Sequence, residues 1–164
     1  MFRKLVPGNP EEYLPEDRFE YAHTYLADEQ RMLFLRGIIV GMSGNLSTSR
    51  IDQFSPLSVG DDITAMNVDD PSRPIYLLIN SPGGSIETGL VLYDLIRMSK
   101  APVITVGMGC ASMATLILAA GSERLIFPHS KLALHLPEAI LQGDSRELEI
   151  QSQELECTKN MLVD

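Results

Sequence analysis

An uncharged stretch of 22 residues, from 101 to 122, limits the folds open to this chain more than any other feature. It is long enough for a helix that crosses a bilayer. However, Pro102 and three glycines interrupt it, Val103–Val106 is rich in β-branched residues, and Ala111–Ala120 consists mostly of helix formers. The pattern therefore predicts a buried strand, a turn and a buried helix, and it argues against a membrane span.

The same alternation of strand and helix continues on both sides of this stretch. Residues 74–80 form an apolar strand sequence that ends in the turn Ser81–Gly84. Ser85 can cap a following helix, whose apolar residues recur at helical spacing while Glu87, Asp94 and Arg97 are left for its wetter side. Further strands are predicted at 125–127 and 131–136, and a last helix after Asp144 or Ser145. This succession predicts an α/β fold of parallel β-α-β units with right-handed crossovers.

The first 72 residues give weaker signals. A strand is predicted within 31–40 because the run is apolar and ends in Gly41. Between residues 45 and 72, Pro56, Gly60 and Pro71 are expected to interrupt any helix, although Asp61–Met66 starts with acidic residues, as helices often do. Residues 1–17 carry Pro, Glu and Asp without periodicity and are predicted to form a flexible N-terminal arm.

Composition excludes several classes of function. The chain has 164 residues with a net charge of -9, which argues against nucleic acid or an anionic membrane as partner. Its two cysteines, Cys110 and Cys157, show no metal-ligand spacing and suit a reducing compartment, so no metal or cofactor is expected. The N-terminus lacks the apolar run of a secretory signal, so a cytoplasmic location is expected.

Three features could carry chemistry, and each also has a structural explanation. Ser112 lies where a strand passes into a helix, so it could be a nucleophile or simply cap that helix. It does not match the G-x-S-x-G motif, because Cys110 and Ala114 occupy the glycine positions. His135 could be a base that activates a serine, or a hydrogen-bonded core histidine. The turn at Gly83 and Gly84 could bind an oxyanion or be only a sharp turn.

Taken in order, these features resemble one protein family. The matching segments are Ile79–Gly84, Tyr93–Asp94, Ala111–Met113 and Pro128–Lys131, followed by His135 and Pro137. They are similar to the proteolytic subunit of the ATP-dependent Clp protease, the ClpP family of serine peptidases. The resemblance runs from about residue 18 to the end, so residues 18–164 are expected to form one ClpP-like α/β domain.

The resemblance implies a crotonase-like fold with a projecting handle helix, and a set of site residues. Ser112 would be the nucleophile, His135 the general base, and the N–H groups of Gly84 and Met113 the oxyanion hole. An extended substrate would add as a strand near Ile86. The residues expected to bind substrate are Gly83, Ser85, Ile86, Leu136 and Pro137.

The resemblance also implies partners. Family members stack as two rings around a chamber, and an AAA+ unfoldase, the Clp ATPase, feeds unfolded polypeptide into it. The N-terminal arm would lie near the axial pore. Apolar residues of the last helix would pack across the contact between rings, or else form ordinary intramolecular core: Leu148, Ile150, Leu155 and Leu162.

The chain departs from the family pattern at several positions. Gly109 stands three places before Ser112, whereas the family has glycine four places before, and Glu138 replaces an apolar residue. The loop 121–124 is shorter than usual and the region 45–60 is longer. In the family, a third catalytic residue, an Asp, follows the handle helix, whereas this chain ends at Asp164, within that helix, and so looks truncated.

Two alternative functions follow. Without the orienting carboxylate the chain could be a non-catalytic or weakly active ring subunit, since neither Asp144 nor Asp164 matches the family position. A crotonase-type acyl-CoA enzyme would share the fold, but it needs a catalytic Glu, and only Glu87 follows the glycine turn.

Overall fold

The computed structural model describes residues 29–41, 56–138 and 141–163. The chain divides into two compact units, residues 1–133 and 134–164. The predicted arm, 1–17, lies outside the described residues. The described elements of the first unit are β1 (Met32–Arg36), α2 (Pro56–Asp69), β2 (Ile75–Ser81), α3 (Ile86–Met98), β3 (Val103–Ala111), α4 (Met113–Ala120), β4 (Glu123–Ile126) and β5 (Leu132–Ala133). The second unit contains α5 (Ser145–Val163).

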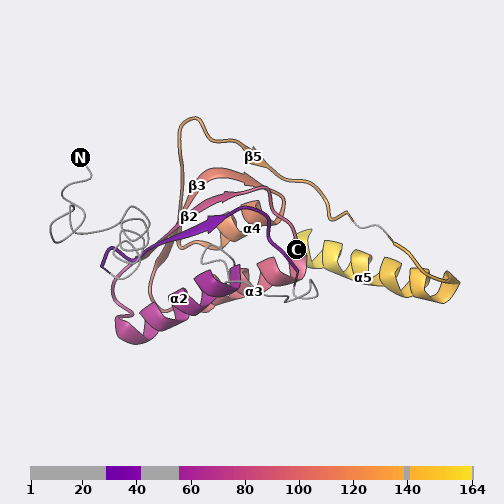
Figure 1. The fold of residues 1–164 in the computed structure, drawn as a ribbon, viewed down its shortest axis with the longest axis horizontal. Coiled ribbons are helices and arrows are strands. Elements are labelled where there is room, and N and C mark those ends of the chain that lie inside the picture. The colour runs from indigo at the N-terminus through magenta and orange to yellow at the C-terminus, as the bar shows by residue number, and fades with distance from the viewer. Residues whose placement is uncertain (1–28, 42–55, 139–140, 164) are drawn as a thin grey trace, which may run out of the picture. The chain divides into compact units, whose positions relative to one another are not determined.

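The strands form a parallel sheet in the order β1-β2-β3-β4, in which β2 lies beside β3 (Figure 1). β5 also pairs with β3, beyond the point where β4 ends: residues 104–107 of β3 face β4, and residues 110–111 face β5. The predicted α/β fold of parallel β-α-β units is therefore confirmed, and it is consistent with a ClpP-like fold.

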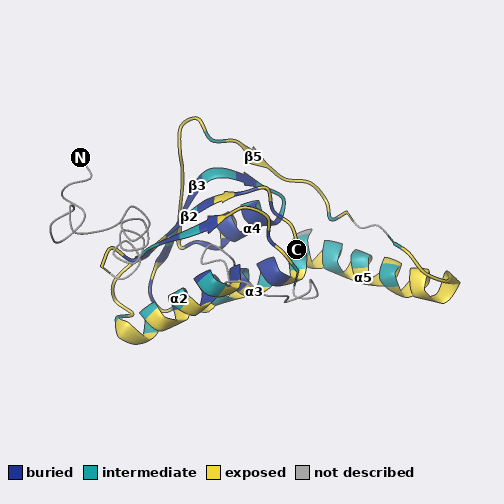
Figure 2. Cartoon of the chain, viewed as in Figure 1, coloured by how far each residue is buried: buried dark blue, intermediate teal, exposed yellow. Residues whose placement is uncertain are grey.

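The core lies on the face of the sheet that the helices cover. Ile75, Leu77 and Ile79 of β2 are fully buried, whereas Tyr76 and Asn80, which point to the opposite face, are exposed. α2, α3 and α4 supply further buried residues of this core (Figure 2), and so do β1 and β3. Alternation along the strand thus places the apolar side chains of β2 against the helices.

The helix predicted after the glycine turn begins where the capping residue indicates. Ser85 Oγ accepts a hydrogen bond from Thr88 N–H at 3.3 Å and caps α3. The three residues predicted for the wetter side of this helix, Glu87, Asp94 and Arg97, are exposed.

The strand predicted within 31–40 is confirmed, whereas the prediction for residues 45–72 was wrong in part. The strand within 31–40 ends at Arg36, because Gly37 turns the backbone at a φ of 75°. A helix does form across Pro56 and Gly60, since Pro56 occupies its first position, where no backbone N–H is needed. Gly60 is buried inside that helix, where Leu95 of α3 occupies the space a side chain would take. The segment 42–55 lies outside the described residues.

The strand predicted at 131–136 is also shorter than expected. β5 contains only Leu132 and Ala133, because its partner β3 ends at Ala111 and the chain then enters α4. His135 therefore follows the strand instead of lying within it.

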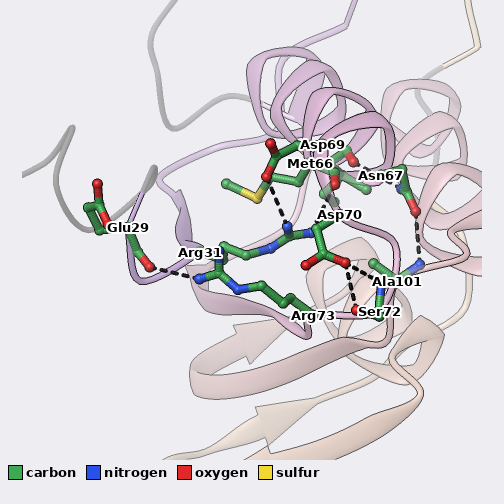
Figure 3. Close-up of polar contacts among 10 residues, drawn as sticks. Glu29, Arg31, Met66, Asn67, Asp69, Asp70, Ser72, Arg73 and Ala101 are labelled. Carbon is green, nitrogen blue, oxygen red and sulfur yellow. Dashed lines mark hydrogen bonds and ion pairs between the residues drawn. The ribbon is translucent and has the colours of Figure 1, made fainter.

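A buried arginine joins the start of the sheet to the end of α2 (Figure 3). Arg31 is only 1% exposed, and its Nη2 donates to the carbonyl of Met66 at 3.0 Å while Nη1 lies 3.6 Å from Asp69 Oδ2. Beside it, Asn67 Oδ1 accepts from the N–H groups of Lys100 and Ala101 at 2.9 Å each. These contacts fix the loop that leads into β3.

A matched pair of valines tests the position of the core. Val103 is 1% exposed and Val68 is 84% exposed. We expect Val103→Ala to lower the free energy of unfolding by about 2–3 kcal/mol, because it removes buried apolar groups and leaves a cavity. Val68→Ala should change it by less than about 0.5 kcal/mol. Urea titration of both variants measures the difference, and equal losses would contradict the described burial.

Candidate active site

Ser112 stands at a strained corner between β3 and α4. Its φ is 55° and its ψ is -129°, a conformation that residues with a side chain rarely adopt. Its hydroxyl makes no capping hydrogen bond to α4. The simple explanation that Ser112 caps the helix is therefore wrong. The corner shares its physical character with a nucleophile elbow although the G-x-S-x-G motif is absent.

The backbone around this corner is held by the neighbouring strand. Ser112 N–H donates to the carbonyl of Ala133 at 2.8 Å, and the Thr115 hydroxyl donates to the same oxygen at 3.1 Å. A few residues before Ser112, the register between β2 and β3 shifts. Ile79 pairs with Gly107 and the next residue, Asn80, pairs with Gly109, so β3 has one extra residue at this point. This bulge bends β3 just before the serine, as bulges beside functional sites often do.

The glycine turn packs directly against the serine corner. A Cβ on Gly83 would lie 2.6 Å from the Ala111 carbonyl oxygen and 2.8 Å from Ser112 Cβ, and its φ is 91°. Only glycine fits this close approach without a shift of the backbone. Ser81 Oγ, which is buried, accepts from the Gly83 N–H at 3.1 Å and holds the turn.

Gly84 is held from the other side, by the segment that follows β1. Ile39 N–H donates to the Gly83 carbonyl at 2.9 Å, and Ser85 N–H donates to the Ile39 carbonyl at 2.7 Å. Ile39 and Gly84 thus form an isolated parallel β-bridge. Its two hydrogen bonds join Ile39 to the residues on either side of Gly84, so the N–H of Gly84 itself points away from Ile39. Gly84 is exposed.

Two backbone N–H groups near the serine make no hydrogen bond. In the described part of the chain, neither Gly84 N–H nor Met113 N–H donates to an acceptor. Met113 is the first residue of α4, so its N–H has no partner within the helix. Its side chain is buried against Gly89 of α3, where a Cβ would collide with it. Sequence periodicity did not single out Gly89, because its role is to leave space for Met113.

The predicted base lies in the second unit. His135 is half exposed, and its Nδ1 lies 3.7 Å from Oε1 of Glu138, which is largely exposed. Leu136 is exposed and Pro137 is half-buried. One residue, Leu134, separates His135 from Ala133, whose carbonyl accepts a hydrogen bond from the Ser112 N–H.

The structure thus brings together only part of the predicted set. Gly83 and Met113 meet Ser112 in the first unit, and Gly84 follows in the same turn. Ser85 and Ile86 begin the helix that continues this turn. The remaining predicted residues, His135, Leu136 and Pro137, belong to the second unit.

A buried thiol lies two residues before the serine. Cys110 Sγ contacts the carbonyl of Ile79 at 3.6 Å, and burial raises the pKa of this thiol above its ordinary value. Since nucleophilic cysteines need a lowered pKa, Cys110 acts as a small core residue.

Two other kinds of site are absent from the described residues. No group of three or more His, Cys, Asp or Glu side chains there could hold a metal ion. No helix among them is both long and apolar enough to cross a membrane.

Comparison with known proteins identifies the family to which the chain is similar. The family model for Clp protease matches residues 31–164. The chain is 43% identical over 101 residues to the ATP-dependent Clp protease proteolytic subunit 2 of Prochlorococcus marinus (strain MIT 9312), covering 59% of this chain and 50% of that protein. It is 35% identical over 131 residues to the ATP-dependent Clp protease proteolytic subunit of Pleurastrum terricola, covering 78% of this chain and 64% of that protein.

The parallel α/β sheet, with a strained serine at the end of a central strand beside a glycine turn, is compatible with the crotonase-like class of folds. The match over residues 31–164 places the chain within that class: it belongs to the Clp protease family. It spans about half the length of several of the curated relatives it matches.

Two glycines test the packing of the turn. Gly83 and Gly37 both have positive φ, but a Cβ on Gly37 would meet nothing within 4 Å. We expect Gly37→Ala to cost about 1–2 kcal/mol of stability from backbone strain alone. Gly83→Ala should cost about 1–3 kcal/mol more, because it overpacks the serine corner. Denaturant titration measures both, and equal losses would show that Gly83 does not touch that corner.

Thiol alkylation tests the environment of Cys110. Cys157 is exposed and Cys110 is buried with a raised pKa. Iodoacetamide at pH 8 should therefore modify Cys157 first, and Cys110 should react only after unfolding in urea, because little of it is thiolate. Peptide mass spectrometry distinguishes the two sites. Equal rates in the folded protein would contradict the described burial.

Proposed function

We propose that this chain is a serine endopeptidase subunit of a Clp-type ATP-dependent proteolytic complex, which cleaves peptide bonds of unfolded polypeptide. The observation that carries the proposal is the serine corner. Ser112 has positive φ and a hydroxyl that caps nothing, and it is packed against a glycine turn. Family membership supports the same chemistry.

In this mechanism, Ser112 Oγ attacks the carbonyl carbon of the substrate while His135 accepts the hydroxyl proton. The oxygen of the tetrahedral intermediate becomes negative and accepts hydrogen bonds from Gly84 N–H and Met113 N–H. Neither of these groups donates to another acceptor among the described residues, whereas Ser112 N–H is already bonded to Ala133. His135 then gives the proton to the leaving amine, and water hydrolyses the acyl group on Ser112.

Substrate would bind as an extended strand along the residues that flank the site. Residues 134–137 follow β5 and make no backbone hydrogen bonds within the described part of the chain, so their N–H and C=O groups can pair with a peptide. Leu136 and Pro137 would line this segment. Gly83, Ser85 and Ile86 would border the substrate beside the oxyanion turn.

The remaining parts of the proposal rest on family membership. We expect the chain to assemble in stacked rings, to receive polypeptide from an AAA+ Clp ATPase, and to act in the cytoplasm. The partly exposed apolar residues of α5, Leu148 and Ile150 among them, are available for the contact between rings.

Labelling with a fluorophosphonate probe tests the nucleophile. The assembled protein should be labelled at Ser112, and Ser112→Ala should abolish labelling and lower hydrolysis of a fluorogenic peptide by at least about 10³-fold, because the nucleophile is lost. Ser152→Ala, an exposed serine on α5, is the matched control and should leave both unchanged.

Two outcomes would contradict the proposal. Labelling at a serine other than Ser112 would remove its role as nucleophile. A protein that forms rings, measured by sedimentation velocity, but is neither labelled nor active would instead be a non-catalytic ring subunit.

A further inference from the structure

We infer that Thr115 is a positioning residue for Ser112: its hydroxyl holds the strained serine corner in the conformation from which the serine can attack. This inference rests on the proposed function of Ser112. It starts from a hydrogen bond within the first unit, in which Thr115 Oγ1 donates to the carbonyl oxygen of Ala133 at 3.1 Å.

Thr115 is bonded to both sides of the serine. Its hydroxyl shares an acceptor with the serine backbone, because the Ser112 N–H donates to the same Ala133 oxygen at 2.8 Å. The N–H of Thr115 donates to the Ser112 carbonyl at 2.9 Å. These three hydrogen bonds close a ring through Ser112, Thr115 and Ala133, so the corner is held by the strand and by the helix at once.

The hydroxyl makes an unusual contact for a threonine in a helix. Such a hydroxyl often donates to a carbonyl three or four residues earlier in the same helix. Thr64 in α2 does so, since its hydroxyl donates to the Gly60 carbonyl at 2.8 Å. The hydroxyl of Thr115 instead donates to β5, 18 residues further along the chain. It therefore joins the first turn of α4 to the neighbouring strand.

The strained backbone of Ser112 explains why this support is needed. A residue with a side chain keeps a φ of 55° only where surrounding contacts hold it there. The ψ angle of Ser112 sets the plane of the peptide that joins it to Met113, and the N–H of this peptide is a proposed oxyanion donor. The carbonyl of the same peptide accepts the hydrogen bond from the Thr115 N–H. Anchoring Thr115 to β5 thus fixes the serine and the Met113 donor together.

Thr115→Val tests the inference, because valine has nearly the same shape and lacks the hydroxyl. The Ala133 carbonyl keeps the Ser112 N–H as a donor, so the variant should fold normally. We expect the second-order rate constant for fluorophosphonate labelling of Ser112 to fall about 5- to 100-fold, because a small displacement of a reacting group has an effect of that order. kcat for peptide hydrolysis should fall in parallel, with KM changed less than about twofold.

Two further variants serve as controls. Thr115→Ser keeps the hydroxyl and should retain most of the labelling rate and of kcat. Thr64→Val removes an exposed hydroxyl from an ordinary hydrogen bond within α2 and should leave both unchanged. If Thr115→Val behaves like Thr64→Val while the parent protein is active, or if Thr115→Ser is as slow as Thr115→Val, the inference fails and the proposed function stands.

Hydrogen exchange separates this failure from a failure of the proposed function. The exchange rate of the Ser112 N–H, measured by mass spectrometry with fragmentation to single residues, reports how firmly the corner is held, whether or not the protein is active. Thr115→Val should raise this rate at least about threefold, as expected for the loss of one hydrogen bond, and Thr64→Val should not change it. If the parent is neither labelled nor active, the proposed function fails, and this measurement alone decides whether Thr115 holds the corner. Equal exchange rates in the parent and Thr115→Val would overturn the inference.

Discussion

The close approach of Gly83 to the end of β3 is the contact on which the candidate site depends. β2 and β3 run parallel and end at the same edge of the sheet, so the turn after one strand meets the corner after the other. With no side chain on Gly83, the turn lies against the Ala111 carbonyl and Ser112 Cβ. Any larger residue would push the turn away and separate Gly84 from the serine.

This packing also decides which backbone groups are free to act. Ala133 binds the Ser112 N–H and Ile39 binds the residues on either side of Gly84. The N–H groups of Gly84 and Met113 are left without acceptors in the described part of the chain. Met113 is in turn fixed by its fit against Gly89. Strand pairing and helix packing therefore leave two backbone donors without acceptors, which is the arrangement that the proposed oxyanion hole requires.

The sequence was sufficient to predict the elements that build this arrangement. β-branched and apolar runs predicted β2 and β3, and Ser85 predicted the start of α3, because periodicity and capping are local properties. α2 was largely missed, because glycine is a poor helix former and the packing of Leu95 beside Gly60 cannot be read from the sequence. The predicted extent of β5, residues 131–136, was also wrong, because the length of an edge strand is set by its partner and not by its own composition.

The residues of the proposed site show the same limit. Ser112, Gly84 and Met113 could be proposed only through their order along the chain, since neither the positive φ of the serine nor the free N–H groups can be seen in a sequence. The contact between Glu138 and His135 could not be predicted either, because it depends on how the backbone runs through Pro137, which residue types alone do not specify.

The most direct test of this account is the crystal structure of the assembled protein after reaction with a fluorophosphonate. The phosphorus should be bonded to Ser112 Oγ, and its phosphoryl oxygen should lie 2.7–3.1 Å from both Gly84 N and Met113 N. A phosphoryl oxygen that points to solvent, or an adduct on another residue, would contradict the claim that this corner is built to bind an oxyanion.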